Sequence, residues 1–224
     1  AINHTNIHNY LGKYFFLDLH FNPISLFILE HTYIKDSQTY FLLGRVYFVE
    51  GNLNSSIRNF TKSIELNPDY KEAYYGRGLA FGFSSPVFYD NAQKDFEKYI
   101  ELENQEYLET NVRAYGAWAG YNDLSWVHFM KGEFARGAQI AKKGLALAPD
   151  SPWLLNILAA NLIEQGKCTE ALPYLEQALQ HAIDTTIVEF GEAYSGDHEK
   201  SWGGGKEQMQ RTIQENIALC KRGV

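Results

Sequence analysis

Residues 37–70 read SQTYFLLGRVYFVEGNLNSSIRNFTKSIELNPDY, and this stretch decides the fold class. It begins with large apolar residues at helical spacing, continues through Gly51, and ends with a second amphipathic stretch before Pro68. Apolar residues three and four positions apart lie on one face of a helix. Glycine accepts the left-handed conformation that ends a helix. The stretch therefore predicts two antiparallel helices joined by a glycine turn.

The same pattern recurs three more times along the chain. Gly132 lies 34 residues before Gly166, and each occupies the turn of a predicted helix pair, as Gly51 does. A further unit, which starts at Lys71, fills the interval between the first unit and the third. The predicted units are residues 37–70, 71–106, 118–151 and 152–183, with an insertion at 107–117. Because one helix pair cannot bury its apolar face alone, the units are expected to stack into a solenoid.

This 34-residue period resembles the tetratricopeptide repeat family, whose pattern places large, small and aromatic residues at fixed slots. The first unit supplies Tyr40, Leu43, Gly44, Tyr47, Ser56, Phe60, Ser63 and Pro68. Later units depart in places: Arg77 stands at a leucine slot, and His128 stands at a tyrosine slot, where a satisfied core imidazole is expected. The resemblance covers residues 37 to about 183. It implies an all-α fold, a right-handed α-solenoid of antiparallel helix pairs.

The segments outside the repeats are less regular. Residues 1–36 are interpreted as a degenerate helix pair that caps the stack, and a hydrophobic segment that docks on a partner is the alternative. Residues 184–205 are expected to be a loop that is partly helical. Residues 206–224 predict a C-terminal capping helix of the same single domain, because one face is apolar and the other polar. The apolar face comprises Met209, Ile213, Ile217 and Cys220.

Composition and charge exclude several classes of protein. The 224 residues are 45% hydrophobic and 15% aromatic, which is typical of a globular chain with one sizeable core. The formal net charge of −7 argues against a general binder of nucleic-acid phosphates. No stretch of about 18 apolar residues that could span a membrane occurs. The compartment stays open between cytoplasm and periplasm, since the chain shows no targeting segment.

The polar residues and the cysteines do not indicate chemistry. Cys168 and Cys220 are not a CxxC pair and are interpreted as two buried or free thiols, with one disulfide as the alternative. No phosphate loop, nucleophile elbow or His-Glu-x-x-His motif occurs. Four acidic residues near a helix end are interpreted as a solvated face: Glu101, Glu103, Glu106 and Glu109. The sequence therefore predicts a protein that is not an enzyme and has no cofactor or metal.

The resemblance also implies where a partner binds. In this family the first helix of each unit lines a concave groove, and certain slots of that helix point into it. The resemblance assigns the residues of this chain that occupy those slots to the groove. The slots hold Phe41, Arg45, Phe48, Tyr75, Asn122, Trp126, Phe129, Trp153 and Asn156. Asn122 and Asn156 lie 34 residues apart, and each amide offers a donor and an acceptor to the backbone of an extended peptide. The groove is expected to be aromatic and mostly neutral, with Arg45 as its one cation.

These features favour a non-catalytic scaffold or adaptor that binds a peptide or helix of a partner protein in the groove. Neither nucleic acid nor membrane insertion is expected. Two alternatives stay open: a self-assembling repeat protein that forms homo-oligomers, and the regulatory repeat segment of a larger enzyme. The aromatic residues also have an internal explanation, because the insertion at 107–117 or the C-terminal tail could fold over the groove.

Overall fold

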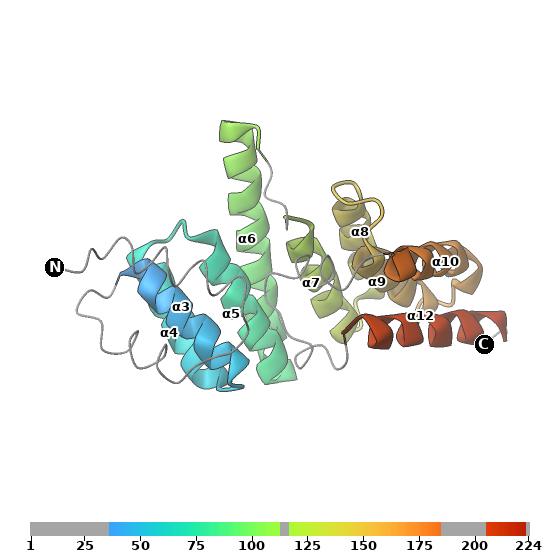
Figure 1. Cartoon of the computed structure of the whole chain (residues 1–224), viewed down its shortest axis with the longest axis horizontal. Coiled ribbons are helices and arrows are strands. Elements are labelled where there is room, and N and C mark those ends of the chain that lie inside the picture. The colour runs from blue at the N-terminus through green and yellow to red at the C-terminus, as the bar shows by residue number, and fades with distance from the viewer. Residues whose placement is uncertain (1–35, 113–116, 185–204, 223–224) are drawn as a thin grey trace. The chain divides into compact units, whose positions relative to one another are not determined.

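The computed structural model describes residues 36–112, 117–184 and 205–222, and within these ranges all secondary structure is helical (Figure 1). The α-helices are α3 (Ser37–Val49), α4 (Leu53–Leu66), α5 (Lys71–Ser84), α6 (Tyr89–Thr110), α7 (Ala117–Met130), α8 (Phe134–Leu145), α9 (Pro152–Ile163), α10 (Cys168–Asp184) and α12 (Gly205–Lys221). One short 3-10 helix, η1 (Pro86–Phe88), precedes α6. The prediction of an all-α solenoid is confirmed.

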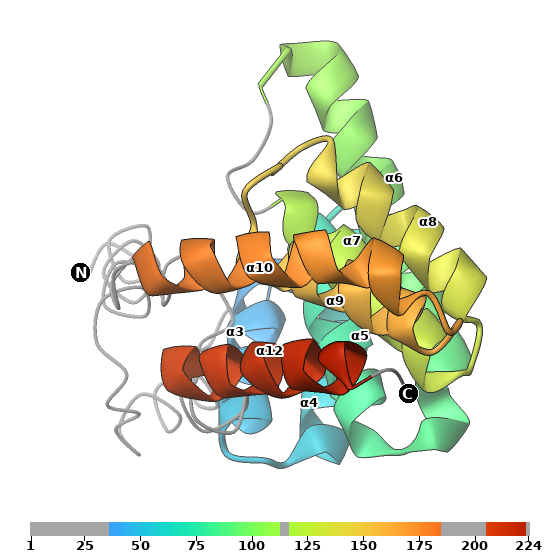
Figure 2. The same cartoon turned by 90° about the vertical axis from the view of Figure 1, so that its right-hand side faces the viewer.

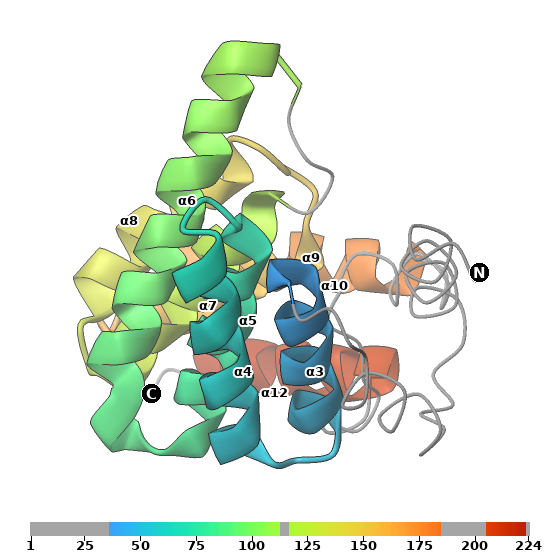
Figure 3. The ribbon, with the colours of Figure 1, turned by 90° about the vertical axis from the view of Figure 1, so that its left-hand side faces the viewer.

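Consecutive helices pack in pairs, and the pairs stack in chain order. The pairs are α3 with α4, α5 with α6, α7 with α8, and α9 with α10. The second helix of each pair also packs against the first helix of the next, as α4 does against α5 (Figure 3). First helices of neighbouring pairs contact each other too, so α3, α5, α7 and α9 form one layer. Each unit thus contacts mainly its neighbours, as in a solenoid.

Glycine is required at three of the turns inside the pairs. Gly51, Gly132 and Gly166 have φ values of 75°, 75° and 72°, and an added Cβ would meet no atom within 4 Å at any of them. The requirement is therefore conformational, because residues with a side chain rarely adopt positive φ. The α5–α6 connection is built without such a glycine: Ser85 is extended and leads directly into η1.

Aromatic rings fill the space between the first two pairs. Phe60, on α4, is 1% exposed. An ideal Cβ on Gly44 or Gly76 would lie 2.6 or 2.5 Å from its ring, so the ring packs directly against the backbones of α3 and α5. Phe96, on α6, is equally buried and belongs to a cluster with Leu124 and other residues of α7 and α8. Large rings packed on small residues therefore hold the first pairs together.

Aliphatic side chains build the C-terminal end of the stack. The cluster there includes Leu155, Leu158, Ala171, Leu175, Ala178 and Ile213, all at most 2% exposed. Helix α12 lies along α10 (Figure 2) and also contacts α9. Ile213 brings α12 into the same cluster, so that this helix covers the last pair.

The prediction of two free thiols is wrong. Cys168 and Cys220 form a disulfide, and their Cα atoms lie 5.1 Å apart. The two residues are 52 positions apart in the sequence, and neither spacing nor local pattern brings them together. Helix α12 packs antiparallel to α10, and this packing places Cys220, in the last turn of α12, beside Cys168, in the first turn of α10.

The helix ends add detail to the predicted unit boundaries, which stay predictions. Helix α6 continues to Thr110, inside the predicted insertion at 107–117, and ends at Asn111 in the left-handed conformation, with a φ of 54°. The predicted N-terminal cap lies outside the described residues except for Asp36. Residues 113–116 and nearly all of the predicted loop at 184–205 also lie outside them. Among the described helices, none has the length and apolar character that a membrane span requires.

Candidate functional site

The candidate site is the first-helix face, which we define as the solvent-exposed part of the surface of α3, α5, α7 and α9. All nine residues predicted for the groove lie on these four helices. Eight of them are partly exposed, and Asn122 is buried at 6% exposure. The nine residues differ in whether they contact residues of another unit, of their own unit, or no hydrogen-bond donor at all.

Three rings from three successive units form an aromatic row on this face. Phe48, on α3, packs edge-on against Phe83, on α5, with ring centroids 5.9 Å apart. Phe83 stacks on Trp126, on α7, at 6.0 Å. Tyr89, at the start of α6, meets the Trp126 ring edge-on at 5.9 Å. Phe83 is 37% exposed, so the aromatic row reaches the surface.

Phe83 is the member of the aromatic row that the sequence does not predict. It directly follows Gly82 and is not among the residues predicted for the groove. An ideal Cβ on Gly82 would lie 3.1 Å from the Trp126 ring, so Trp126 covers this glycine and reaches Phe83. The sequence feature that could have indicated Phe83 is an aromatic residue directly after a glycine on a first helix.

A second aromatic contact joins α7 to α9. Trp153 stacks on Trp118, with centroids 5.4 Å apart and planes inclined by 28°. Trp118 is 8% exposed, whereas Trp153 is partly exposed. Trp118, in the first turn of α7, is also absent from the predicted site. The pair extends the aromatic character of the face to the fourth unit.

Two predicted residues point toward the ends of their own units. The Phe41 ring lies between Phe60 and Tyr70, at centroid distances of 5.8 and 4.9 Å, and the Arg45 guanidinium lies 5.9 Å from its centroid. Phe129 packs edge-on against Phe134 of α8 at 5.6 Å. These contacts place Phe41 and Phe129 against their own second helices or turns.

Tyr75 and Asn122 converge on a buried carboxylate. The Tyr75 hydroxyl donates to Asp123 Oδ2 at 2.7 Å, and Asn122 Nδ2 donates to Asp123 Oδ1 at 3.1 Å. Asp123 is 1% exposed. Hydrogen bonds to a charged acceptor are strong, and both donors are thus engaged within the chain. The cluster ties α5 to α7 beneath the first-helix face.

Asn156 differs from Asn122. Its side chain is partly exposed, but Oδ1 is buried and makes no hydrogen bond to any described residue. A buried amide oxygen without a donor costs free energy, so such groups are rare in native proteins. Asn156 therefore retains unused hydrogen-bonding capacity on α9.

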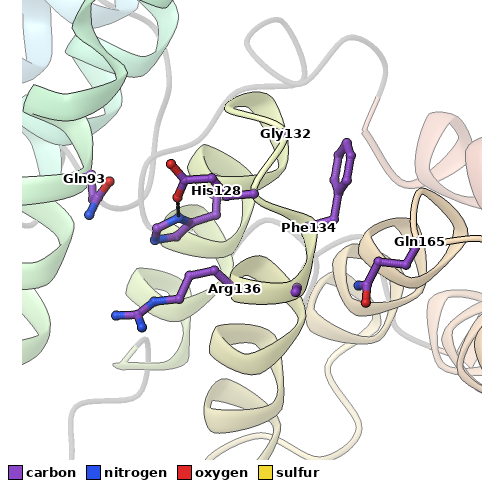
Figure 4. A pocket seen from close by; sticks show the side chains of 8 residues that line it. Gln93, His128, Gly132, Phe134, Arg136 and Gln165 are labelled. Atoms are coloured by element: carbon purple, nitrogen blue, oxygen red, sulfur yellow. Dashed lines mark hydrogen bonds and ion pairs between the residues drawn. The ribbon is translucent and has the colours of Figure 1, made fainter.

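A separate open cleft of about 590 Å³ lies at the turn ends of the third and fourth units (Figure 4). Its lining comprises Gln93, His128, Gly132, Glu133, Phe134, Ala135, Arg136 and Gln165, none of which belongs to the predicted site. Figure 4 shows the His128 and Arg136 side chains extending toward the side of Gln93, while Phe134 and Gln165 lie on the other side. The cleft is thus polar on the side that faces α6.

His128 is only partly satisfied in this cleft. Its ring is 2% exposed, and Nδ1 lies 2.6 Å from Glu133 Oε2. That hydrogen bond holds the pKa of Glu133 below its ordinary value. Nε2 is buried and has no hydrogen-bond partner among the described residues, so the expected satisfied imidazole is satisfied on one side. Within the described part of the chain, no group of three His, Cys, Asp or Glu residues could hold a metal ion.

The four acidic residues of α6 were expected to form a solvated face, and one of them is buried instead. Glu103 is 2% exposed, and its carboxylate pairs with Lys71 Nζ at 2.8 Å. Glu106 pairs with the same ammonium group, whereas Glu101 and Glu109 are exposed. The interpretation is therefore wrong for Glu103, because Lys71 at the start of α5 reaches the acidic side of α6.

The comparisons identify the repeats. A family model described as TPR repeat matches residues 44–82, which run from α3 to α5. Residues 44–82 match a TPR repeat, and the described helix pairs have the TPR fold. TPR folds are typical of protein-interaction scaffolds that have no catalytic activity. No curated protein matches the sequence.

Solved structures with the same architecture support the TPR assignment. The MamA AMB-1 structure is 19% identical, with a TM-score of 0.61, and the match covers 80% of this chain and 95% of that one. TTC0263, a thermophilic TPR protein of Thermus thermophilus, is 16% identical, with a TM-score of 0.56 and coverage of 86% and 95%. The Cut9–Hcn1 hetero-tetramer of the APC/C is 15% identical, with a TM-score of 0.63 and coverage of 98% and 40%. At these identities the likeness concerns the fold alone.

Proposed function

We propose that the chain is a non-catalytic scaffold or adaptor that binds a peptide or helix of a partner protein on its first-helix face. The aromatic row carries the proposal, because Phe48, Phe83 and Trp126 place rings from three successive units in direct contact. An extended or helical ligand that crosses the units would meet all three rings.

The chemistry of the face suits an apolar ligand side chain. Aromatic residues dominate the energetics of protein interfaces, since each buries a large area at a low entropic cost. The Trp118–Trp153 pair offers a second apolar contact in the direction of the C-terminus. We expect the ligand to insert at least one large apolar residue beside Phe83.

Asn156 is proposed to orient the ligand backbone. Its amide has a polar atom without a partner among the described residues, and it lies on the same helix as Trp153. Rotation of the amide would bring this oxygen to the surface, where a ligand N–H could donate to it and remove the cost of an unpaired buried acceptor. Asn122 has a smaller part in this proposal, because its Nδ2 already donates to Asp123.

The test uses two phenylalanines with equal exposure. Phe83 and Phe88 are both 37% exposed, but only Phe83 belongs to the aromatic row, while Phe88 packs on Phe81. A photo-crosslinking residue placed at position 83 or 88 of the full chain identifies proteins that touch each site. The affinity of a purified partner segment is then measured by calorimetry for wild type, Phe83→Ala, Trp126→Ala and Phe88→Ala.

We expect Phe83→Ala and Trp126→Ala to weaken binding at least about tenfold, which corresponds to about 1.4 kcal/mol. Phe88→Ala should stay within about twofold of wild type, since it lies outside the row. Equal affinities for all four proteins, with unchanged helicity, would contradict the proposal. If the crosslinked partner is a second copy of the chain, light scattering over a concentration series will show a rising mass and favour self-assembly.

A further inference from the structure

The disulfide clamps one end of an antiparallel helix pair at the end of the stack. Cys168 is the first residue of α10, and Cys220 lies in the last turn of α12. At the opposite end of the pair, Gln210 Nε2 donates to the Ala182 carbonyl at 3.0 Å, and Lys206 Nζ donates to the Ile183 carbonyl at 2.9 Å. Figure 2 shows the two helices side by side. The covalent bond and these hydrogen bonds therefore hold α12 at its two ends.

Helix α12 occupies the place that the first helix of a further repeat would take. It packs on α10 and also contacts α9, just as α9 packs on α8 and also contacts α7. Ile213 lies in the cluster that contains Leu175 and Ala178, and Met209 and Ile217 pack against that cluster. Removal of α12 would uncover this apolar end of the solenoid.

Helix α12 buries few of its side chains for its length, although Met209 and Ile217 also pack against the core. Among its described side chains, only Ile213 and Cys220 are buried, although the helix has 17 residues. Helix α10, also of 17 residues, buries Ala171, Leu175 and Ala178 together with Ala182. The polar contacts of α12 are exposed or half-exposed, and such contacts add little net stability. The covalent bond therefore adds to these contacts a constraint that holds the last turn of α12 on α10.

We infer that the Cys168–Cys220 disulfide is a redox latch: its reduction releases α12 and exposes the apolar end of the repeat stack. The reductant is a dithiol. Cys168 is partly exposed whereas Cys220 is 7% exposed, so the thiolate of the dithiol attacks Cys168 Sγ. The Cys168–Cys220 bond breaks, a mixed disulfide forms at Cys168, and Cys220 leaves as a thiolate that takes a proton from water.

The second thiol of the reductant completes the exchange. It loses its proton and attacks the reductant's own sulfur in the mixed disulfide, which releases Cys168 as a thiolate. The Cys168 thiolate then takes a proton from water, so the protein ends with two thiols, and the reductant ends as a cyclic disulfide that has lost two electrons.

Hydrogen exchange of the full chain, with and without dithiothreitol, tests the latch. Mass spectrometry after alkylation first verifies that both cysteines are reduced. We expect amide exchange in residues 206–221 to accelerate at least about tenfold on reduction. Residues 71–84, in α5, should exchange at an unchanged rate because they lie outside the last pair. Unchanged exchange in residues 206–221 after complete reduction would overturn the inference.

The Cys168→Ser/Cys220→Ser variant is the matched control. Its α12 should exchange rapidly with or without dithiothreitol, while α5 keeps the wild-type rate. If dithiothreitol accelerates exchange in this variant too, the effect does not pass through the disulfide and the inference fails. If the variant unfolds as a whole, α5 will also exchange rapidly, and the wild-type experiment with α5 as internal reference then decides.

Discussion

The α3–α6 region and the α9–α10 region have the same helix-pair architecture but different packing chemistry. In the first region, the rings of Phe60 and Phe96 fill the space between helices, and glycines let the backbones approach those rings. In the second region, leucines such as Leu158 and Leu175 pack against alanines. The repeat period therefore sets the helix arrangement, while large and small side chains can fill the space between the helices in more than one combination.

The two regions also differ in buried charge. Arg77 donates to Asp95 from two nitrogens, at 2.8 Å each, and its third nitrogen donates to Thr61 at 3.1 Å. Burial raises the pKa of Asp95, although the hydrogen bonds from Arg77 oppose that shift. The equivalent slot of the last unit holds Leu158, which is fully buried. The second unit therefore joins its two helices through an ion pair at a position where the fourth unit uses an aliphatic side chain.

The largest expected effect comes from Phe60→Ala. We expect a loss of about 4 kcal/mol in the free energy of unfolding, because the ring packs on both α3 and α5 and glycines cannot fill the resulting cavity. Leu175→Ala is the matched change in the aliphatic region and should cost about 3 kcal/mol. Urea unfolding monitored by circular dichroism measures both. A larger loss for Leu175→Ala would show that the aromatic packing is not the stronger of the two.

The helix pairs could be predicted from the sequence because their signals are local. Gly51, Gly132 and Gly166 mark turns that require positive φ, and the apolar spacing on either side marks the buried faces. These features depend on backbone conformation and helix periodicity alone. The fold class therefore followed from one unit and its repetition.

The candidate site could be predicted only in part, because its contacts cross between units. The predicted residues include Phe48 and Trp126, but Phe83, whose ring contacts both, is not among them. The Asp123 carboxylate that engages Tyr75 and Asn122 is likewise invisible in slot spacing. Such contacts depend on side-chain direction at the junction of two units, which the period does not fix.

The next prediction concerns the ion pair of the second unit. Arg77→Leu restores the residue type that the repeat pattern favours, but it leaves the Asp95 carboxylate, which is 5% exposed, without its partner. We expect a loss of about 2 kcal/mol at pH 7, because an uncompensated buried charge is unfavourable. The loss should shrink as the pH falls, since a protonated Asp95 carries no charge. Urea unfolding at pH 5 and pH 7 measures this dependence.

The double variant Arg77→Leu/Asp95→Ala removes both members of the ion pair. We expect it to lie within about 1 kcal/mol of wild type, because replacement of a buried ion pair by apolar residues is often nearly neutral. That result would show that the aliphatic chemistry of the fourth unit also works in the second. A double variant less stable than Arg77→Leu alone would instead show that the aromatic region requires polar contacts.

The smallest expected effect lies at the α7–α8 turn, between the two regions. The hydrogen bond from His128 lowers the folded-state pKa of Glu133 below the ordinary 4.5, so the carboxylate stabilises the folded state above that pH. This contribution is lost as the pH falls through the lowered pKa. Glu133 is 45% exposed, so Glu133→Gln should cost less than about 1 kcal/mol at pH 6, and the cost should vanish as the pH falls through the lowered pKa. Urea titrations of wild type, Glu133→Gln and the exposed control Glu109→Gln measure this cost. A pH-independent difference for Glu133→Gln would mean that the carboxylate charge does not stabilise this turn.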